Sequence, residues 1–380
     1  MHRNAAYILV LCVLSLVVLG LVVLSSTSPY SDGDVPDKMF YTQRQALWLV
    51  CGLAAGAAAA FIDYHWWQRL VWPLFGFSLL LLVCCFLPEI GLRINGSARW
   101  INLGIGTFQP SEFAKLAAIA LLAHWFARHA DEAGSFTHGL LVPGALMALP
   151  MALIVAEIDF GTTLLLGALA GLMMFVGGSR LRYLAPIALA ALLALVAAVQ
   201  LVPERVERIT ALFDLEEHRM GAGLQQYQAL IAFGSGGVDG LGLGDGRQKM
   251  MYLPYAHTDF IFPMIGEELG LKFTLSIVFV YLMVCACGMT IAVNAGDRFG
   301  MLMGFGVVAL LGLQAMVNIG VTVALLPNKG LPLPFISYGG SNLAVCLVGI
   351  GILMNIFQQG KPVKAPINRR RLQARTLPRL

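Results

Sequence analysis

Long runs of apolar residues make up most of the chain and are separated by shorter polar stretches. A helix that crosses a bilayer needs about 20 mostly apolar residues, and ten runs come close to or exceed that length. They cover residues 5–24, 45–62, 70–87, 112–127, 139–156, 160–178, 183–202, 262–293, 299–326 and 341–357. The pattern therefore predicts ten transmembrane helices, and an even number of crossings puts both ends of the chain on one side of the membrane.

The connections between these runs differ in length. Glu157 and Asp159 interrupt a long apolar stretch, which predicts a tight helical hairpin at that point. Residues 88–111 and 203–261 form two long connections, and a loop as long as the second is uncommon unless it has a function. We therefore expect the function to involve the side of the membrane that these two connections share.

Composition supports a membrane protein. The 380 residues are 58% hydrophobic and 12% charged, which excludes a disordered chain, a secreted disulfide scaffold and a soluble nucleic-acid binder. The seven cysteines lie inside apolar runs without metal-ligand spacing, so no metal site is expected from them. The fold class is therefore an all-α polytopic membrane protein. Its membrane domain spans residues 1–360, with 203–261 as a large extracytoplasmic loop between helices 7 and 8, and a basic tail covers 361–380.

The charge distribution places both termini in the cytoplasm. With that orientation the inner face carries net positive charge and the outer face net negative charge, as the positive-inside rule requires. The tail, 361–380, holds seven Lys and Arg residues and no acid, which suits a cytoplasmic anchor beside anionic lipid.

A first cluster of polar residues lies in residues 96–115, which read GSARWINLGIGTFQPSEFAK. Glu112 and Lys115 are three residues apart, so they fit either a structural salt bridge on one helix face or a substrate role. Arg99 and Trp100 fit either an interfacial anchor or a site that binds phosphate and stacks on sugar.

A second cluster lies in residues 252–270, which read YLPYAHTDFIFPMIGEELG. Thr258 is suited to capping the following helix. Asp259 is followed directly by Phe260, Ile261 and Phe262, so its carboxylate should be partly desolvated and its pKa raised towards that of a useful general base. Ionisable groups at the membrane edge are functional candidates by default.

A third cluster lies in residues 328–341, which read NKGLPLPFISYGGS. Its prolines and glycines prevent a regular helix, and irregular backbone at membrane depth occurs only inside protein or beside an aqueous cavity. Lys329 is suited to a surface charge or to an anion-binding cleft.

These motifs, together with GLQQYQALIAFGSGG at 223–237, resemble those of the SEDS (shape, elongation, division and sporulation) family of peptidoglycan polymerases. The resemblance covers essentially the whole chain. It implies a ten-helix enzyme that joins lipid II units into glycan strands on the outer leaflet. The segment LLPNKGLPLPFISYGG is closer to the division type, FtsW, than to the elongation type, RodA.

The resemblance also implies roles for individual residues. Asp259 would be the catalytic base, and Lys115 and Lys329 are favoured over Arg99 as cations for the pyrophosphate. The other expected substrate-binding residues are Trp100, Glu112, Gln225, Gln228, His257 and Ser337. Whether a divalent cation, Mg²⁺ or Mn²⁺, assists the pyrophosphate is left open.

The implied partners are a growing undecaprenyl-linked glycan, a monofunctional class B penicillin-binding transpeptidase and other division proteins. The implied location is the inner membrane at the septum. A lipid II flippase, an elongation-type polymerase and a non-catalytic scaffold remain alternatives. A flippase requires polar residues across the membrane midplane, and a scaffold requires no base at Asp259.

Overall fold

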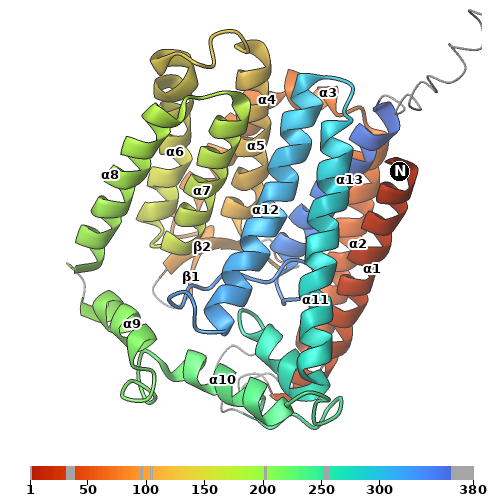
Figure 1. Cartoon of the computed structure of the whole chain (residues 1–380), viewed down its shortest axis with the longest axis vertical. Coiled ribbons are helices and arrows are strands. Elements are labelled where there is room, and N and C mark those ends of the chain that lie inside the picture. The colour runs from red at the N-terminus through yellow and green to blue at the C-terminus, as the bar shows by residue number, and fades with distance from the viewer. Residues whose placement is uncertain are drawn as a thin grey trace, which may run out of the picture.

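The computed structural model describes residues 2–30, 39–94, 97–102, 104, 106–200, 203–250 and 257–360. The predicted tail, 361–380, lies outside the described residues. The fold is a helical bundle with a small sheet (Figure 1). The elements, in chain order, are α1 His2–Thr27, η1 Ser28–Tyr30, α2 Phe40–Phe61, α3 His65–Arg69, α4 Val71–Cys84, β1 Gly91–Ile94, β2 Ser97–Asn102, β3 Thr107–Phe108, α5 Pro110–Arg128, the π-helical turn η2 Thr137–Leu141, α6 Val142–Ala156, α7 Phe160–Gly177, α8 Leu181–Gln200, α9 Pro203–Phe213, α10 Leu224–Gly236, α11 Ile261–Val293, α12 Arg298–Thr322 and α13 Gly340–Gln359.

Each of the ten apolar runs coincides with a helix, and the predicted helical, polytopic fold class is confirmed. Within the described residues, seven helical spans are long and apolar enough to cross a membrane: those of α1, α2, α6, α7, α11, α12 and α13. The other three runs fall on α4, α5 and α8, and α4 has only 14 residues. The count of ten crossings therefore stays a prediction.

The tight turn predicted at residues 157–159 is present. Helix α6 ends at Ala156, and Asp159 caps α7 by accepting a hydrogen bond from the Thr162 amide. Ile158 lies between them with a φ of 65°, a left-handed conformation that reverses the chain over three residues.

The core of the bundle contains close backbone contacts. Helix α13 packs most extensively against α2. A Cβ on Gly351 of α13 would lie 2.0 Å from the Gly56 carbonyl oxygen of α2, so only glycine permits this approach.

The described ends of the chain lie at the same end of the bundle (Figure 1), as the even number of runs predicts. There the fully buried Tyr64 ties the segment after α2 to two other helices. Its amide donates to the Asn355 side chain of α13 at 2.8 Å, and its hydroxyl donates at 2.7 Å to Asp297, which caps α12.

The other end of the bundle carries the two long connections. Strands β1, β2 and β3 form an antiparallel sheet in that order, which the sequence reading did not anticipate. Helices α9 and α10 occupy part of the larger connection and lie across this end in Figure 1.

The glycine-rich stretch after α10 is held against the start of α11. Glu267 accepts hydrogen bonds from the amides of Arg247 and Gln248, and Glu268 forms a buried ion pair of 2.7 Å with Lys249. Helix α11 is kinked at Gly270, whose φ is 78°. Glu267 and Glu268 therefore anchor the larger connection.

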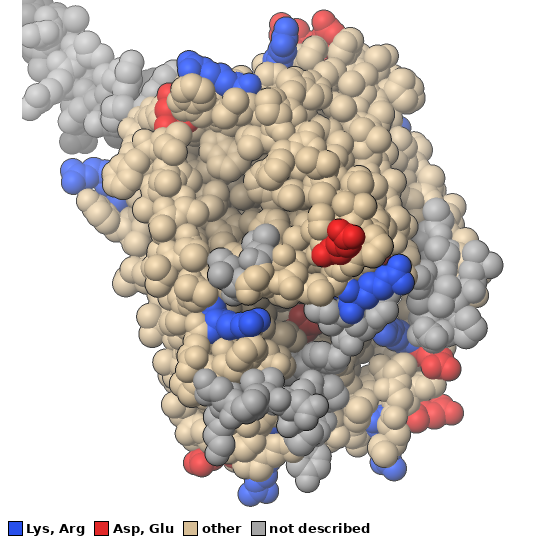
Figure 2. Space-filling model, turned by 180° about the vertical axis from the view of Figure 1, so that it is seen from behind, with Lys and Arg blue, Asp and Glu red and all other residues tan. Residues whose placement is uncertain are grey.

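Surface charge follows the same division between ends. Figure 2 shows Lys, Arg, Asp and Glu gathered at the upper edge and in the lower half of one face, with a nearly uncharged band between them. Such a band is what a hydrocarbon layer requires of the surface that it contacts.

Candidate functional site

Asp259 lies two residues before α11, at the end of the bundle that carries the sheet. It is half-buried, and its backbone carbonyl accepts a 2.8 Å hydrogen bond from Asn318 of α12. Asn318 also donates to the Leu331 carbonyl at 2.7 Å, which draws the connection between α12 and α13 against Asp259. A Cβ on Gly330 would lie 2.7 Å from the Asp259 Oδ2 atom, so the carboxylate packs directly against glycine backbone.

Arg99 of β2 and Asp159 of α7 lie beside this aspartate. The Arg99 Nη1 atom is 3.6 Å from the Asp159 Oδ2 atom. Asp159 also accepts hydrogen bonds from the Thr162 amide at 3.0 Å, the Thr162 hydroxyl at 2.9 Å and the Gln109 amide group at 3.4 Å. The Arg99 Nε atom is buried and has no hydrogen-bond partner among the residues that the structure describes.

The electrostatic environment suits a base that works near neutrality. Burial raises the pKa of Asp259 to about 6; among smaller effects, Arg99 lowers this pKa and Asp159 raises it. Burial also raises the pKa of the neighbouring Glu157 to about 8, with a further contribution from the charge of Asp159. Both Glu157 carboxylate oxygens are buried, beside the Cys85 thiol.

Lys329 borders the same site through the first turn of α7. A Cβ on Gly161 would lie 3.7 Å from the Lys329 Cβ atom and 3.7 Å from the Asp159 Oδ1 atom. Since Gly330 faces Asp259, the structure gathers Asp259, Arg99 and Lys329 around the start of α7.

Glu112 and Lys115 form the i, i+3 ion pair that the sequence permits, at 2.8 Å between Oε1 and Nζ. Asn342 of α13 donates to Glu112 at 2.9 Å, and Gln314 of α12 lies 3.4 Å from the Lys115 ammonium. Lys115 is fully buried, so its ammonium is covered by protein in this conformation. This geometry favours the structural alternative for the pair.

The remaining candidates are distributed around this centre. Gln225 of α10 accepts a hydrogen bond from the Asn328 side chain, and Gln228 is half-buried one turn further along. Trp100 is half-buried and follows Arg99 on β2, where Leu92 pairs with Trp100 and Arg93 with Ala98, so Arg99 is the extra residue of a β-bulge.

His257 and Ser337 meet through the connection before α13. The centroids of the His257 and Tyr41 rings lie 4.3 Å apart with the rings tilted by 35°, and the His257 carbonyl accepts a hydrogen bond from the Tyr338 amide. The Ser337 hydroxyl accepts a 2.8 Å hydrogen bond from the Leu333 amide, which fixes the turn.

Sequence reasoning missed several residues that surround Asp259. Asp159, Glu157, Gln109 and Asn318 were not selected as site residues. A signal existed for the first two, because a carboxylate inside an apolar stretch is a functional candidate by default. Nothing local in the sequence marks Gln109 or Asn318.

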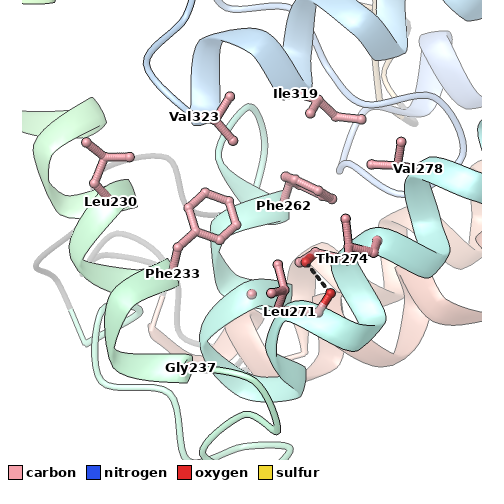
Figure 3. A pocket seen from close by; sticks show the side chains of 11 residues that line it. Leu230, Phe233, Gly237, Phe262, Leu271, Thr274, Val278, Ile319 and Val323 are labelled. Atoms are coloured by element: carbon pink, nitrogen blue, oxygen red, sulfur yellow. Dashed lines mark hydrogen bonds between the residues drawn. The ribbon is translucent and has the colours of Figure 1, made fainter.

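A separate apolar cavity of about 360 Å³ lies between α10, α11 and α12 (Figure 3). Its walls include Phe233, Phe262 and Ile319, and its one polar side chain, Thr274, bonds the Leu271 carbonyl of its own helix. The cavity therefore lacks the charged groups of the Asp259 site. Within the described ranges, moreover, no three His, Cys, Asp or Glu side chains are grouped to hold a metal ion.

Comparisons with known proteins agree with this architecture. Residues 6–361 match the profile of the FtsW, RodA and SpoVE family, described as cell cycle proteins. A Geobacter metallireducens protein named "Probable peptidoglycan glycosyltransferase FtsW" is 40% identical over 350 residues, which cover 92% of this chain and 93% of that protein. Stage V sporulation protein E of Bacillus subtilis is 35% identical, with 92% and 96% covered.

Two solved structures share the fold. One, from work on the coordination of polymerization and crosslinking by a peptidoglycan synthase complex, has a TM-score of 0.76 and 29% identity, covering 92% of this chain and 96% of that chain. The other, the rod shape determining protein RodA of Thermus thermophilus, has a TM-score of 0.69 and 26% identity, with 93% and 97% covered.

Proposed function

Because the chain belongs to the FtsW, RodA and SpoVE family, we propose that it is a multi-pass membrane enzyme that polymerises lipid II into peptidoglycan glycan strands. The reaction displaces a polyprenyl pyrophosphate from the anomeric carbon of one sugar by the 4-hydroxyl of another. Such a displacement needs a base on the attacking hydroxyl and positive charge on the leaving group.

The half-buried Asp259 beside Arg99 is the observation that carries the mechanistic part of this proposal. Asp259 removes the proton from the attacking hydroxyl, and a pKa of about 6 leaves it mostly ionised at neutral pH. The partly exposed Arg99 and Lys329 supply positive charge for the pyrophosphate. Gln225, Gln228 and Trp100 would shape the substrate site.

The proposed setting is the division septum, with both termini in the cytoplasm and the Asp259 end facing outwards. The FtsW names of relatives such as the Geobacter protein support the division role. The proposed partner is a class B penicillin-binding transpeptidase, because polymerisation without crosslinking would leave loose strands. The structural relative from a peptidoglycan synthase complex supports this pairing.

The experiment that tests the function incubates the purified protein with labelled lipid II, with and without the cognate transpeptidase, and resolves the products on a gel. We expect a ladder of glycan chains. Transfer of intact lipid II across reconstituted vesicles without chain growth would instead support a flippase. Absence of both activities in the presence of the transpeptidase would support the scaffold.

A further inference from the structure

We infer that Asp159 is a positioning residue, which holds the partly exposed Arg99 guanidinium in place to bind the substrate pyrophosphate. This inference rests on the proposed function, since it assigns a role within that reaction. Asp159 makes no direct contact with substrate in this role and acts only through Arg99.

The contacts of Asp159 exceed what a helix cap requires. Its Oδ1 atom accepts the Thr162 amide, which is the ordinary capping bond of α7. Its Oδ2 atom meets three further groups, the Thr162 hydroxyl, the Gln109 amide and Arg99. The carboxylate is only 4% exposed, so it joins α7, β2 and the residue before α5 in a buried junction.

At this junction, Arg99 has more N–H donors than its contact with Asp159 uses. A guanidinium carries five N–H donors in a rigid plane, and Asp159 lies close to Nη1. The Nε atom is buried and finds no hydrogen-bond partner among the described residues, while the side chain as a whole is 28% exposed. An arginine that is held by a buried carboxylate and is still partly exposed is suited to an entering phosphate oxygen.

Charged and titratable side chains from several elements lie near Asp259 and affect its pKa. The charged and titratable groups around Asp259 are Arg99 from β2, Asp159 from α7, Lys329 before α13 and His257 in the same segment, with Glu157 behind Asp159. Arg99 lowers the pKa of Asp259 and Asp159 raises it. The Arg99 charge therefore favours the ionised form of Asp259, and the strength of that effect depends on where Asp159 holds the guanidinium.

The test measures protonation of Asp259 without relying on turnover. The full-length protein is treated across a pH series with a hydrophobic carbodiimide, which reacts with the protonated form of a carboxyl group, and labelling of Asp259 is quantified by mass spectrometry. The wild-type midpoint should lie near pH 6. Asp159→Asn keeps a capping oxygen for α7. Arg99→Gln should raise the midpoint by about one unit in the wild-type background and by clearly less in the Asp159→Asn background, where the guanidinium is no longer held beside Asp259.

Asp297→Asn is the matched control for the cap. Asp297 caps α12 through the Gly300 amide at 2.8 Å, at the end of the bundle where the described termini lie, so this change should leave the midpoint in place. An equal rise on Arg99→Gln in the wild-type and Asp159→Asn backgrounds would overturn the inference, as would an unchanged midpoint in Arg99→Gln.

A second pair of variants addresses orientation and serves if Asp159→Asn fails to fold. Thr162→Val removes the hydroxyl bond to the Asp159 carboxylate and keeps its charge, so a loosened Arg99 should raise the midpoint and lower kcat. Thr163→Val is its control, because the Thr163 hydroxyl bonds only the Asp159 backbone carbonyl among these groups. Equal behaviour of the two threonine variants would contradict a positioning role. Polymerisation by Asp259→Asn would refute the proposed base while leaving these midpoints interpretable.

Discussion

At the scale of single residues, Asp259 carries the largest expected effect. Asp259→Asn keeps the shape of the side chain and loses its basicity, so polymerisation should fall by about 10²- to 10⁴-fold. The wild-type rate should also decline as the pH falls through about 6, because protonation removes the base. The measurement is glycan chain formation from labelled lipid II over a pH series.

Asp239→Asn is the control for that experiment. Asp239 pairs with Lys272 at an exposed position, where an ion pair contributes little. A wild-type rate in the Asp259 variant would remove this residue from the mechanism, whereas equal losses in both variants would indicate a general defect.

Glu157 gives a prediction about stability. Its pKa is raised by burial from an ordinary value of 4.5 to about 8, so the folded protein holds this proton in a pH range where the unfolded chain releases it. Glu157 therefore lowers the free energy of unfolding progressively as the pH rises from about 4.5 to 8. Glu157→Gln should raise the melting temperature by at least about 2 °C at pH 8 and by much less at pH 5. A difference that grows at low pH would contradict this account.

The sequence revealed the reactive residue more readily than its surroundings. Asp259 was recognisable because the aromatic and aliphatic residues after it predict desolvation, a local property. The contact between Asp159 and Arg99 was not predicted, because the two residues lie sixty positions apart in the sequence. In addition, Arg99 lies on β2, a strand that the local pattern did not predict. Lys115 fits a cation site by its spacing, and only the bundle shows that its ammonium is covered.

At the scale of elements, the close contact between α10 and α11 depends on glycines, which have no side chain to separate the two backbones. A Cβ on Gly236 would lie 2.0 Å from the Gly266 carbonyl oxygen, so Gly236→Ala must separate the two backbones. We expect a loss of thermal stability in detergent together with a loss of polymerisation. Gly234→Ala, on the same helix, meets nothing within 4 Å and should behave as wild type. Equal stability of the two variants would show that the contact is dispensable.

The ion pair between Glu112 and Lys115 links α5 to its neighbours. Removing one partner leaves a buried charge without its counterion, which typically costs about 3–5 kcal/mol of stability. Lys115→Ala and Glu112→Ala should each be strongly destabilising, and the double variant should lose less than the sum of the two. A double-mutant cycle of unfolding free energies measures this coupling.

Turnover of the folded fraction separates the two interpretations of that pair. A structural pair predicts nearly normal turnover per folded molecule in Lys115→Ala. A lysine that stabilises the leaving pyrophosphate predicts normal stability with a large loss of kcat.

At the scale of the whole molecule, the orientation in the membrane is open to direct measurement. In a cysteine-free background, Met220→Cys, which is highly exposed between α9 and α10, should react with an impermeant thiol reagent added outside. Ala374→Cys in the basic tail should react only after the membrane is permeabilised. The reverse pattern would overturn the predicted topology and the outer-leaflet reaction.

Most of the architecture was predictable at this scale because hydrocarbon leaves few alternatives to an apolar helix. All ten runs fall on helices, and the short turn at residues 157–159 follows from the carboxylates that flank it. The sheet was not predictable, because β1 and β3 have four and two residues and are defined by pairing with β2.

The buried Tyr64 has a mechanical consequence for substrate entry. It joins the segment after α2 to α12 and α13 at the end opposite Asp259, through Asp297 and Asn355. These bonds resist separation of the segment after α2 from α12 and α13 at that end. An opening among these three elements that admits a substrate should therefore be larger at the Asp259 end than at the Tyr64 end.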